Sequence, residues 1–176
     1  MSDQPIAEVE HKAKAAKAAA HALANAGEKA KNRALELMVE EIGRQKPAIL
    51  AANQADVSAA KDKGIDDYLI DRLTLSDKRI ADMQEGLRQM IALPDPVGET
   101  LSGWRRPNGL QITKVRVPIG LIGVIYESRP NVTVDAASLC IKSGNAVILR
   151  GGSETTRSNI ALTRALQDAL YSAGLP

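Results

Sequence analysis

Apolar and polar positions alternate with a helical period through the first half of the chain. Residues 6–26 are rich in alanine, which has the highest intrinsic helix propensity, and predict a helix. Residues 29–60 predict a second helix with a kink or break near Gly43 and Pro47. A third helix is predicted after Ser76, a favourable N-cap residue. The apolar stripes of the second and third helices consist of Leu35, Met38, Ile42, Ile49, Leu50, Ile80, Met83, Leu87, Met90 and Ile91.

The pattern changes within residues 93–98, where two prolines and a glycine prevent a helix from continuing. Residues 104–117 then place the turn-forming sequence Pro107-Asn108-Gly109 between two stretches of mixed polar and apolar residues. This arrangement is typical of a β-hairpin. We therefore expect a solvent-exposed hairpin after the helical part.

The remaining residues alternate between apolar runs and helical periodicity. Residues 119–126 are almost wholly apolar apart from two glycines, which predicts a parallel strand covered on both faces. A helix over 134–142, ended by Gly144, precedes a second buried strand over 146–149 and a helix over 155–173. This order describes the first half of a doubly wound sheet, so the predicted fold class is α/β. Because two strands leave apolar edges uncovered, we expect the natural polypeptide to be longer.

The composition restricts both the core and the partners. Hydrophobic residues make up 44% and charged residues 25% of the 176 positions, as in a soluble globular protein, and Phe is absent, so the core must consist of aliphatic residues. The net charge of +2 is spread along the sequence, and no nucleic-acid partner is assigned. No run of about 18 apolar residues occurs, and there is one cysteine. These features predict a cytoplasmic protein without a membrane segment or an internal disulfide.

Two motifs resemble those of a known enzyme family. Residues 117–131, VPIGLIGVIYESRPN, are similar to the P-x-G-V-x-x-x-x-P-W-N strand and turn of aldehyde dehydrogenases, and residues 142–154, KSGNAVILRGGSE, to their G-N-x-x-V-x-K-P-S-E strand and loop. The segments YESRPNVTVD and VILRGGSE resemble the corresponding segments of the γ-glutamyl phosphate reductase branch. The resemblance implies an aldehyde-dehydrogenase-like nucleotide-binding domain, here an incomplete doubly wound parallel sheet with N-terminal helices and a protruding hairpin.

Arg150 stands at the exit of the second strand, where the family places the basic residue that meets the adenosine ribose of the cofactor. A guanidinium offers a planar fork of donors that suits a 2′-phosphate, which favours NADPH over NADH. An arginine that only solvates the end of a strand is the alternative.

The other predicted cofactor-binding residues are Gly151, Gly152, Ser153 and Glu154. The glycines would let the backbone approach a ligand closely, or they form an ordinary turn. Ser153 and Glu154 match the Ser-Glu of the dehydrogenase loop, although two glycines replace its single proline. A carboxylate would accept a hydrogen bond from a free 2′-hydroxyl and repel a 2′-phosphate, so Glu154 favours NADH. The family resemblance favours NADPH, which we adopt.

Two residues after the first strand are candidates for acting on the substrate. Asn131 matches the asparagine whose side-chain N–H stabilises the oxyanion in aldehyde dehydrogenases, or it shapes the turn and caps the next helix. The spacing from Gly120 to Asn131 is longer than in the dehydrogenase pattern. Arg129 could bind the phosphate or the α-carboxylate of an acidic substrate.

Neither the cysteine nor the histidines are predicted to carry chemistry. Cys140 lies in the run AASLCIK on the apolar side of a predicted helix, where a thiol behaves as a small hydrophobe. The resemblance places the nucleophilic cysteine beyond Pro176. His11 and His21 lie on the alanine-rich helix without a cluster of cysteines or carboxylates, so no metal site is predicted.

The resemblance implies an NADPH-dependent oxidoreductase of proline biosynthesis that reduces L-glutamyl 5-phosphate to L-glutamate 5-semialdehyde and forms a homo-oligomer. It divides the chain into a helical part of the cofactor-binding domain (1–98), an oligomerisation hairpin (99–117) and the first half of the nucleotide-binding unit (118–176). A general aldehyde dehydrogenase is an alternative that Arg-Gly-Gly, in place of Lys-Pro, disfavours. A non-catalytic nucleotide-binding or assembly module is another, and a stop codon after Pro176 would favour it.

Overall fold

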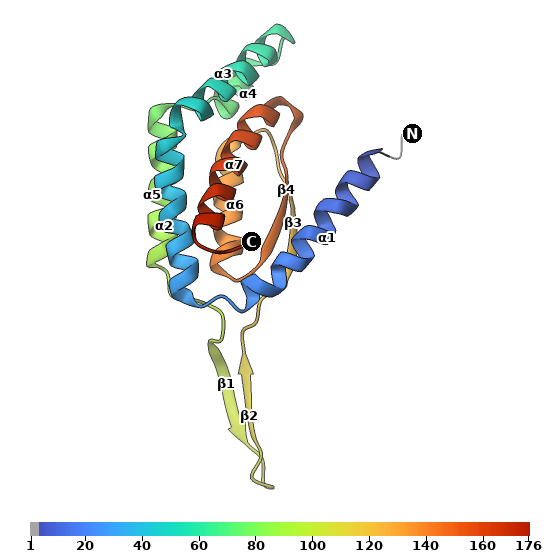
Figure 1. The fold of residues 1–176 in the computed structure, drawn as a ribbon, viewed down its shortest axis with the longest axis vertical. Coiled ribbons are helices and arrows are strands. Elements are labelled where there is room, and N and C mark those ends of the chain that lie inside the picture. The colour runs from blue at the N-terminus through green and yellow to red at the C-terminus, as the bar shows by residue number, and fades with distance from the viewer. Residues whose placement is uncertain (1–3) are drawn as a thin grey trace.

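The computed structural model describes residues 4–176, which form a helical first half and a mixed second half (Figure 1). The first half contains α1 (Gln4–Ala24), α2 (Glu28–Arg44), α3 (Lys46–Asp62), α4 (Asp67–Leu73) and α5 (Asp77–Ala92). The second half contains β1 (Thr100–Arg105), β2 (Gln111–Val115), β3 (Leu121–Ile125), α6 (Pro130–Lys142), β4 (Ala146–Arg150), the 3-10 helix η1 (Ser153–Thr155) and α7 (Thr156–Ser172). Within the described residues, no helix is long and apolar enough to cross a membrane.

The helix boundaries follow from caps and breakers in the sequence. The predicted N-cap of α5 is confirmed, because the hydroxyl oxygen of Ser76 accepts a hydrogen bond from the backbone N–H of Arg79 at 3.2 Å. The break predicted near Gly43 and Pro47 is also present, and it separates α2 from α3 at Gln45. The helix α4 was not predicted from the sequence, because its seven residues are too few to show an apolar period.

The main core lies between helices from both halves of the chain. Contacts join α2 to α5 and α7, α3 to α7, and α6 to α5 and α7 (Figure 1). The buried side chains are aliphatic residues and methionines, as the composition predicted: Leu35, Met38, Ile42, Ile49, Leu75, Ile80, Met83, Leu87, Val134, Ala137, Ile141, Leu162, Ala165, Leu166 and Ala169. Because this core is densely packed, it holds α7 in a fixed position.

The strands β3 and β4 form a sheet of their own, in which they run parallel with Leu121 opposite Ala146. The helix α6 packs on one face of this pair, and α1 lies on the other (Figure 1). The expectation that both faces of the first strand are covered is wrong, because Ile125 is 87% exposed. The contacts of α1 cluster at the amino-terminal ends of the strands, where Leu23 packs with Ala146, and they leave the carboxyl end open.

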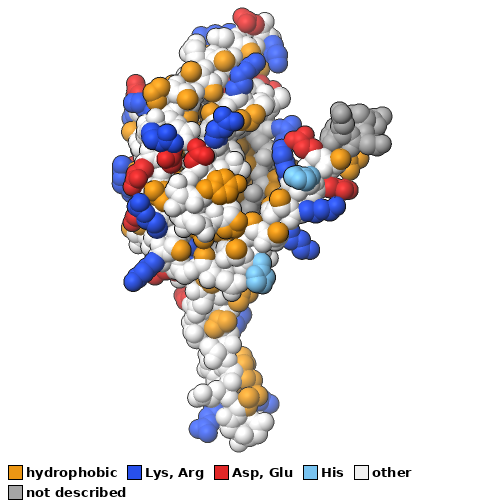
Figure 2. Space-filling view, viewed as in Figure 1, with side chains coloured by type: hydrophobic (Ala, Val, Ile, Leu, Met, Phe, Trp, Pro, Cys, Tyr) orange, Lys and Arg blue, Asp and Glu red, His pale blue; other side chains and the backbone are white. Residues whose placement is uncertain are grey.

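The predicted hairpin is confirmed, although its first strand begins at Thr100 rather than at Trp104. The strands β1 and β2 pair antiparallel, and the ribbon projects away from the helical body (Figure 1). At its tip Gly109 has φ of +89°, which a glycine adopts without strain. Apolar side chains remain on its surface (Figure 2), with Trp104 49% and Leu110 57% exposed.

A buried ion pair fixes the segment from which the hairpin starts. The ammonium of Lys31 on α2, itself 1% exposed, lies 2.6 Å from a carboxylate oxygen of Asp95. Burial raises the pKa of Asp95, but hydrogen bonds from Lys31 and from the backbone of Val97, with the attraction of Lys31 and Lys142, outweigh it and hold that pKa below its ordinary value. The ionised carboxylate therefore joins the linker to the helical body.

Candidate nucleotide-binding site

Two loops meet at the carboxyl ends of β3 and β4. One loop, residues 126–129, leads from β3 into α6, and the other, residues 151–155, leads from β4 into α7; we name the second the nucleotide loop. The backbone N–H of Tyr126 donates to the carbonyl oxygen of Arg150 at 3.0 Å. The hydroxyl of Ser128 donates to a carboxylate oxygen of Glu154 at 2.5 Å. The two loops are thus joined by both backbone and side-chain hydrogen bonds.

The two glycines of the nucleotide loop lie in close contact with neighbouring side chains. A Cβ atom at Gly151 would lie 3.0 Å from the ring of Tyr126 and would collide with the amide nitrogen of Asn159. A Cβ atom at Gly152 would collide with the hydroxyl oxygen of Ser128. The glycines therefore let the nucleotide loop lie directly against the loop after β3.

A series of hydrogen-bonded polar side chains links the two loops through α6 and α7. The hydroxyl groups of Tyr126 and Thr133 are 2.6 Å apart, and that of Thr133 donates to the side-chain oxygen of Asn159 at 3.2 Å. The amide of Asn159 donates in turn to the hydroxyl oxygen of Thr155 at 3.1 Å. Burial raises the pKa of Tyr126, an effect that the hydrogen bond with Thr133 partly offsets, so the phenol stays protonated at neutral pH.

The charged residues predicted to bind the cofactor lie at the surface of this edge. Arg150 is exposed, and its guanidinium donates to the carbonyl oxygen of Gly151. The two carboxylate oxygens of Glu154 accept hydrogen bonds from the hydroxyls of Ser128 and Ser153, the second at 2.7 Å. These two hydrogen bonds lower the pKa of Glu154 below its ordinary value, so the side chain is an anion at neutral pH.

The two residues predicted to act on the substrate begin α6. Arg129 occupies the N-cap position, and its Nε atom is buried without a hydrogen-bond partner, 3.5 Å from a carboxylate oxygen of Glu127. Asn131 lies in the first turn, where its amide donates to the carboxylate of Asp135 at 3.3 Å. The alternative in which Asn131 caps this helix is therefore wrong. No hydrogen bond among residues 4–176 joins Asn131 to the nucleotide loop.

Cys140 is buried, as the sequence predicted, with 6% of its surface exposed. Burial raises the pKa of the thiol above its ordinary value of 9.0, so the reactive thiolate is scarce at neutral pH. His11 and His21 are exposed on α1. Among residues 4–176, no three histidines, cysteines or carboxylates gather as metal ligands would.

The sequence analysis missed two polar residues behind the nucleotide loop. Asn53 and Asp56 on α3 are buried, with exposures of 2% and 3%, and both contact the start of α7. A signal was present, because both positions share the helical face of Ile49, Val57 and Ala60. Burying two polar side chains at core positions of a helix costs free energy unless they are hydrogen-bonded. Such a pair therefore indicates a specific hydrogen-bonded contact.

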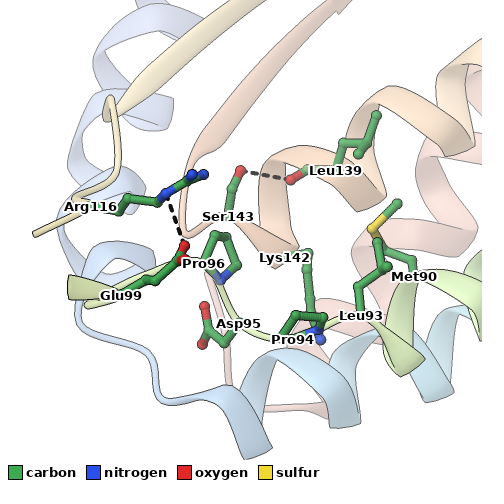
Figure 3. Close-up of a pocket in the computed structure, with 10 residues that line it drawn as sticks. All are labelled: Met90, Leu93, Pro94, Asp95, Pro96, Glu99, Arg116, Leu139, Lys142 and Ser143. Atoms are coloured by element: carbon green, nitrogen blue, oxygen red, sulfur yellow. Dashed lines mark hydrogen bonds and ion pairs between the residues drawn. The ribbon is translucent and has the colours of Figure 1, made fainter. Parts of the chain in front are cut away.

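A surface groove lies at the opposite end of the sheet, at the base of the hairpin (Figure 3). Its lining includes Met90, Leu93 and Leu139 together with the ion pair of Arg116 and Glu99, whose nitrogen and oxygen are 2.9 Å apart (Figure 3). None of the residues predicted to bind cofactor or substrate lines this groove. The candidate site is therefore the open carboxyl edge of the sheet and not the groove.

Comparisons with known proteins identify the fold and the relatives of the chain. No family model matches it. A probable aldehyde dehydrogenase from Listeria monocytogenes superposes with a TM-score of 0.72 at 14% identity, over 98% of this chain and 35% of that one. The crystal structure of γ-glutamyl phosphate reductase from Thermotoga maritima superposes with a TM-score of 0.94 at 46% identity, over 96% of this chain and 41% of that one. The γ-glutamyl phosphate reductase of Moorella thermoacetica is 58% identical over 169 residues.

The fold is thus that of the aldehyde dehydrogenases, which confirms the predicted fold class. Within that class, the chain is a relative of the γ-glutamyl phosphate reductases and corresponds to their N-terminal portion, as the motifs indicated. The chain spans about 40% of the length of the curated relatives it matches.

Proposed function

We propose that this chain is the nucleotide-binding part of an enzyme that reduces L-glutamyl 5-phosphate to L-glutamate 5-semialdehyde with NADPH, in proline biosynthesis. The observation that carries the proposal is the construction of the carboxyl edge of β3 and β4, where two loops pack against each other through Gly151 and Gly152. Ligands of open α/β sheets bind outside this edge. The similarity to γ-glutamyl phosphate reductases covers 96% of the chain and supports the choice of reaction.

The residues at this edge fit a phosphorylated dinucleotide. Arg150 presents an exposed guanidinium at the end of β4, which suits the 2′-phosphate of NADPH. Glu154 is an anion and would repel that phosphate, although hydroxyls of Ser128 and Ser153 already donate to its two carboxylate oxygens. The choice of NADPH over NADH therefore rests on Arg150 and on the family resemblance. When bound, NADPH supplies the hydride.

The substrate side of the site involves the loop after β3. The Nε–H of Arg129 makes no hydrogen bond and lies 3.5 Å from the exposed side chain of Glu127. The guanidinium of Arg129 would bind the phosphate or the α-carboxylate of glutamyl phosphate. Asn131 in the first turn of α6 would donate its amide N–H to the oxyanion that forms on the acyl carbon. In this role the amide would exchange its present partner, Asp135, for the substrate oxygen.

A cysteine outside residues 1–176 supplies the nucleophile in this proposal. Its thiolate attacks the acyl carbon and expels phosphate, and the resulting thioester accepts the hydride and releases the aldehyde. Cys140 is unsuitable, because burial raises the pKa of its thiol. The chain then divides as the motifs indicated, into 1–98, 99–117 and 118–176, and the protein is a cytoplasmic homo-oligomer.

The reverse reaction of the full-length protein tests this proposal. Purified protein is mixed with glutamate 5-semialdehyde, NADP⁺ and inorganic phosphate, and the absorbance of NADPH is followed. We expect NADPH to form only when phosphate is present, because phosphate must be consumed to give the acyl phosphate. Equal rates without phosphate would indicate a general aldehyde dehydrogenase, and no reduction under either condition would indicate a non-catalytic module.

A further inference from the structure

The amino terminus of α7, which follows the nucleotide loop, is capped by a residue from a distant part of the chain. Asp56 on α3 accepts hydrogen bonds from the backbone N–H groups of Ser158 at 2.7 Å and Arg157 at 3.4 Å. The N-cap residue itself, Thr155, makes no capping hydrogen bond with its side chain. Asp56 therefore caps the amino terminus of α7, although it lies 102 positions before Ser158 in the sequence. Its negative charge lies at the positive end of the helix dipole.

Asp56 is held in this position by a fully satisfied network. The hydroxyl of Ser158, which is 0% exposed, donates to the same carboxylate oxygen at 2.7 Å. That hydroxyl accepts from the amide of Asn53 at 3.0 Å, and Asn53 also donates to the carbonyl oxygen of Leu73 at 2.7 Å. The guanidinium of Arg157 lies 3.3 Å from the other oxygen of Asp56. Buried networks that satisfy every member are rigid, so α3 and the start of α7 move as one body.

The nucleotide loop is fixed between two anchored ends. At its start, Arg150 is hydrogen-bonded into the sheet through the N–H of Tyr126 at 3.0 Å. At its end, Thr155 is 0% exposed and directly precedes the helix that Asp56 caps. Removing the cap would free the first turn of α7, and with it the carboxyl end of a five-residue loop over 151–155.

We propose that Asp56 is a positioning residue for the nucleotide loop, and that its carboxylate closes the amino terminus of α7 to phosphate. Helix amino termini commonly bind the phosphates of nucleotides through their free N–H groups. Here the N–H groups of Arg157 and Ser158 already donate to a buried anion, so the phosphates of the cofactor contact other donors at the edge. This inference rests on the proposed function, because it assigns the loop to the cofactor.

The test uses the full-length protein with Asp56→Asn and Ser158→Ala, and titrates NADPH by its fluorescence. Asp56→Asn removes the charge and replaces one of the two acceptor oxygens by an NH2 group, so one of the two helix N–H groups loses its acceptor. We expect it to raise the Kd and the KM for NADPH roughly tenfold, the range for substitutions behind a binding site, and to leave the KM for glutamyl phosphate within about twofold. Ser158→Ala removes one donor to Asp56 and should raise the Kd by a smaller factor, about threefold.

The matched control is Ser138→Ala. Ser138 is also a buried serine, 3% exposed, and its hydroxyl donates to the backbone of α6 at the carbonyl of Asp135. It should lower the melting temperature without changing the Kd for NADPH, which separates positioning from stability. Amide hydrogen exchange provides a second readout, because the N–H of Ser158 should exchange faster in Asp56→Asn than in the control.

The outcomes separate the two claims. NADPH binding that is equally tight in the unsubstituted protein, Asp56→Asn and Ser158→Ala would overturn the positioning role while leaving the proposed function intact. A complex in which a cofactor phosphate accepts the N–H of Ser158 would overturn the closed amino terminus. If the unsubstituted protein binds no NADPH, the proposed function fails and this inference fails with it. Should Asp56→Asn not fold, Ser158→Ala decides the question.

Discussion

In the proposed function, Arg150 is the residue that selects between the two nicotinamide cofactors. Its guanidinium is exposed at the carboxyl end of β4, and the adjacent Glu154 carboxylate accepts hydrogen bonds from two hydroxyl groups. In the full-length protein, Arg150→Ala should raise the KM for NADPH about tenfold or more and change the KM for NADH about twofold at most, because charge-assisted hydrogen bonds to a phosphate are lost. Steady-state kinetics with each cofactor measures both values.

An exposed arginine elsewhere provides the control for this substitution. Arg88 on α5 is 55% exposed in its side chain and pairs with Glu85 on the same helix. Arg88→Ala should leave both KM values unchanged. Equal small effects of Arg150→Ala on both cofactors would remove Arg150 from the site and favour the alternative, an arginine that solvates the end of a strand.

Cys140 should be unreactive in the folded protein, because its thiol is buried and its pKa is raised above 9.0. At pH 8 we expect iodoacetamide to alkylate it at least about tenfold more slowly in native protein than in urea, where both the pKa and the exposure return to ordinary values. Mass spectrometry of quenched samples follows the reaction. Rapid alkylation of native protein at pH 8 would show an accessible thiolate and would reopen the question of whether Cys140 is a nucleophile.

At the scale of elements, the turn from α6 into β4 depends on one glycine. Gly144 has φ of +74°, and a Cβ atom there would lie 2.9 Å from Pro118 and 3.3 Å from Val97. Gly144→Ala should therefore lower the free energy of unfolding by about 1–3 kcal/mol, from backbone strain and close contacts. Gly86 lies inside α5 with nothing within 4 Å of an added Cβ, so Gly86→Ala should raise the same quantity by about 0.5–1 kcal/mol. Urea denaturation measures both changes, and equal effects would contradict the strain argument.

Among residues 4–176, the strands β1 and β2 of the hairpin make their main contacts with each other. Its side chains are exposed along the whole of β1, and a two-stranded ribbon alone is marginally stable in water. We expect it to pair with another subunit, as the resemblance implies. Deletion of residues 103–114 from the full-length protein should shift the molar mass in light scattering towards that of the monomer. An oligomer of unchanged mass would assign the interface to another surface.

Most elements could be predicted because their signals are local. A helical period, the N-cap Ser76 and the turn residues around Asn108 each act within a few positions, and the corresponding helices and hairpin are present. The burial of β3 could not be predicted from its own residues, because it depends on how far α1 extends along the sheet. That distance is set by packing at Leu23 and Ala146, which lie far apart in the sequence.

The candidate site shows the same division. The sequence around Arg150 predicted a strand that ends at Leu149, and β4 ends at Arg150, because strand ends are encoded locally. The contact of Asp56 with Ser158 could not be found in this way, since it joins α3 to α7 through the folded core. The sequence shows that Asp56 is a polar residue at a core position of a helix, but it does not show that Ser158 is its hydrogen-bond partner.

At the scale of the whole molecule, helices from the first half pack on the second half and fix the position of α7. The helices α2 and α3 pack on α7 and thereby hold the loop that ends at Thr155 (Figure 1). The opposite face of the sheet is covered by α1 only near the amino ends of the strands, and Ile125 at the carboxyl end of β3 is 87% exposed. The relatives that are similar over 96% of this chain are longer, and the matched residues make up about 40% of their length. Apolar exposure of this kind is typical of a surface that further structure covers.

The 176-residue chain on its own should neither reduce glutamyl phosphate nor oxidise glutamate semialdehyde. Acyl transfer requires an activated thiolate, and the one cysteine of the chain is buried with a raised pKa. We expect weak binding of NADPH at the carboxyl edge of β3 and β4, without turnover. The measurement is NADPH oxidation by purified chain at high protein concentration, with the full-length protein as the positive control and Cys140→Ser as the matched variant. Activity of the isolated chain that Cys140→Ser abolishes would show that Cys140 reaches the substrate, and would overturn the assignment of the nucleophile to a cysteine outside these residues.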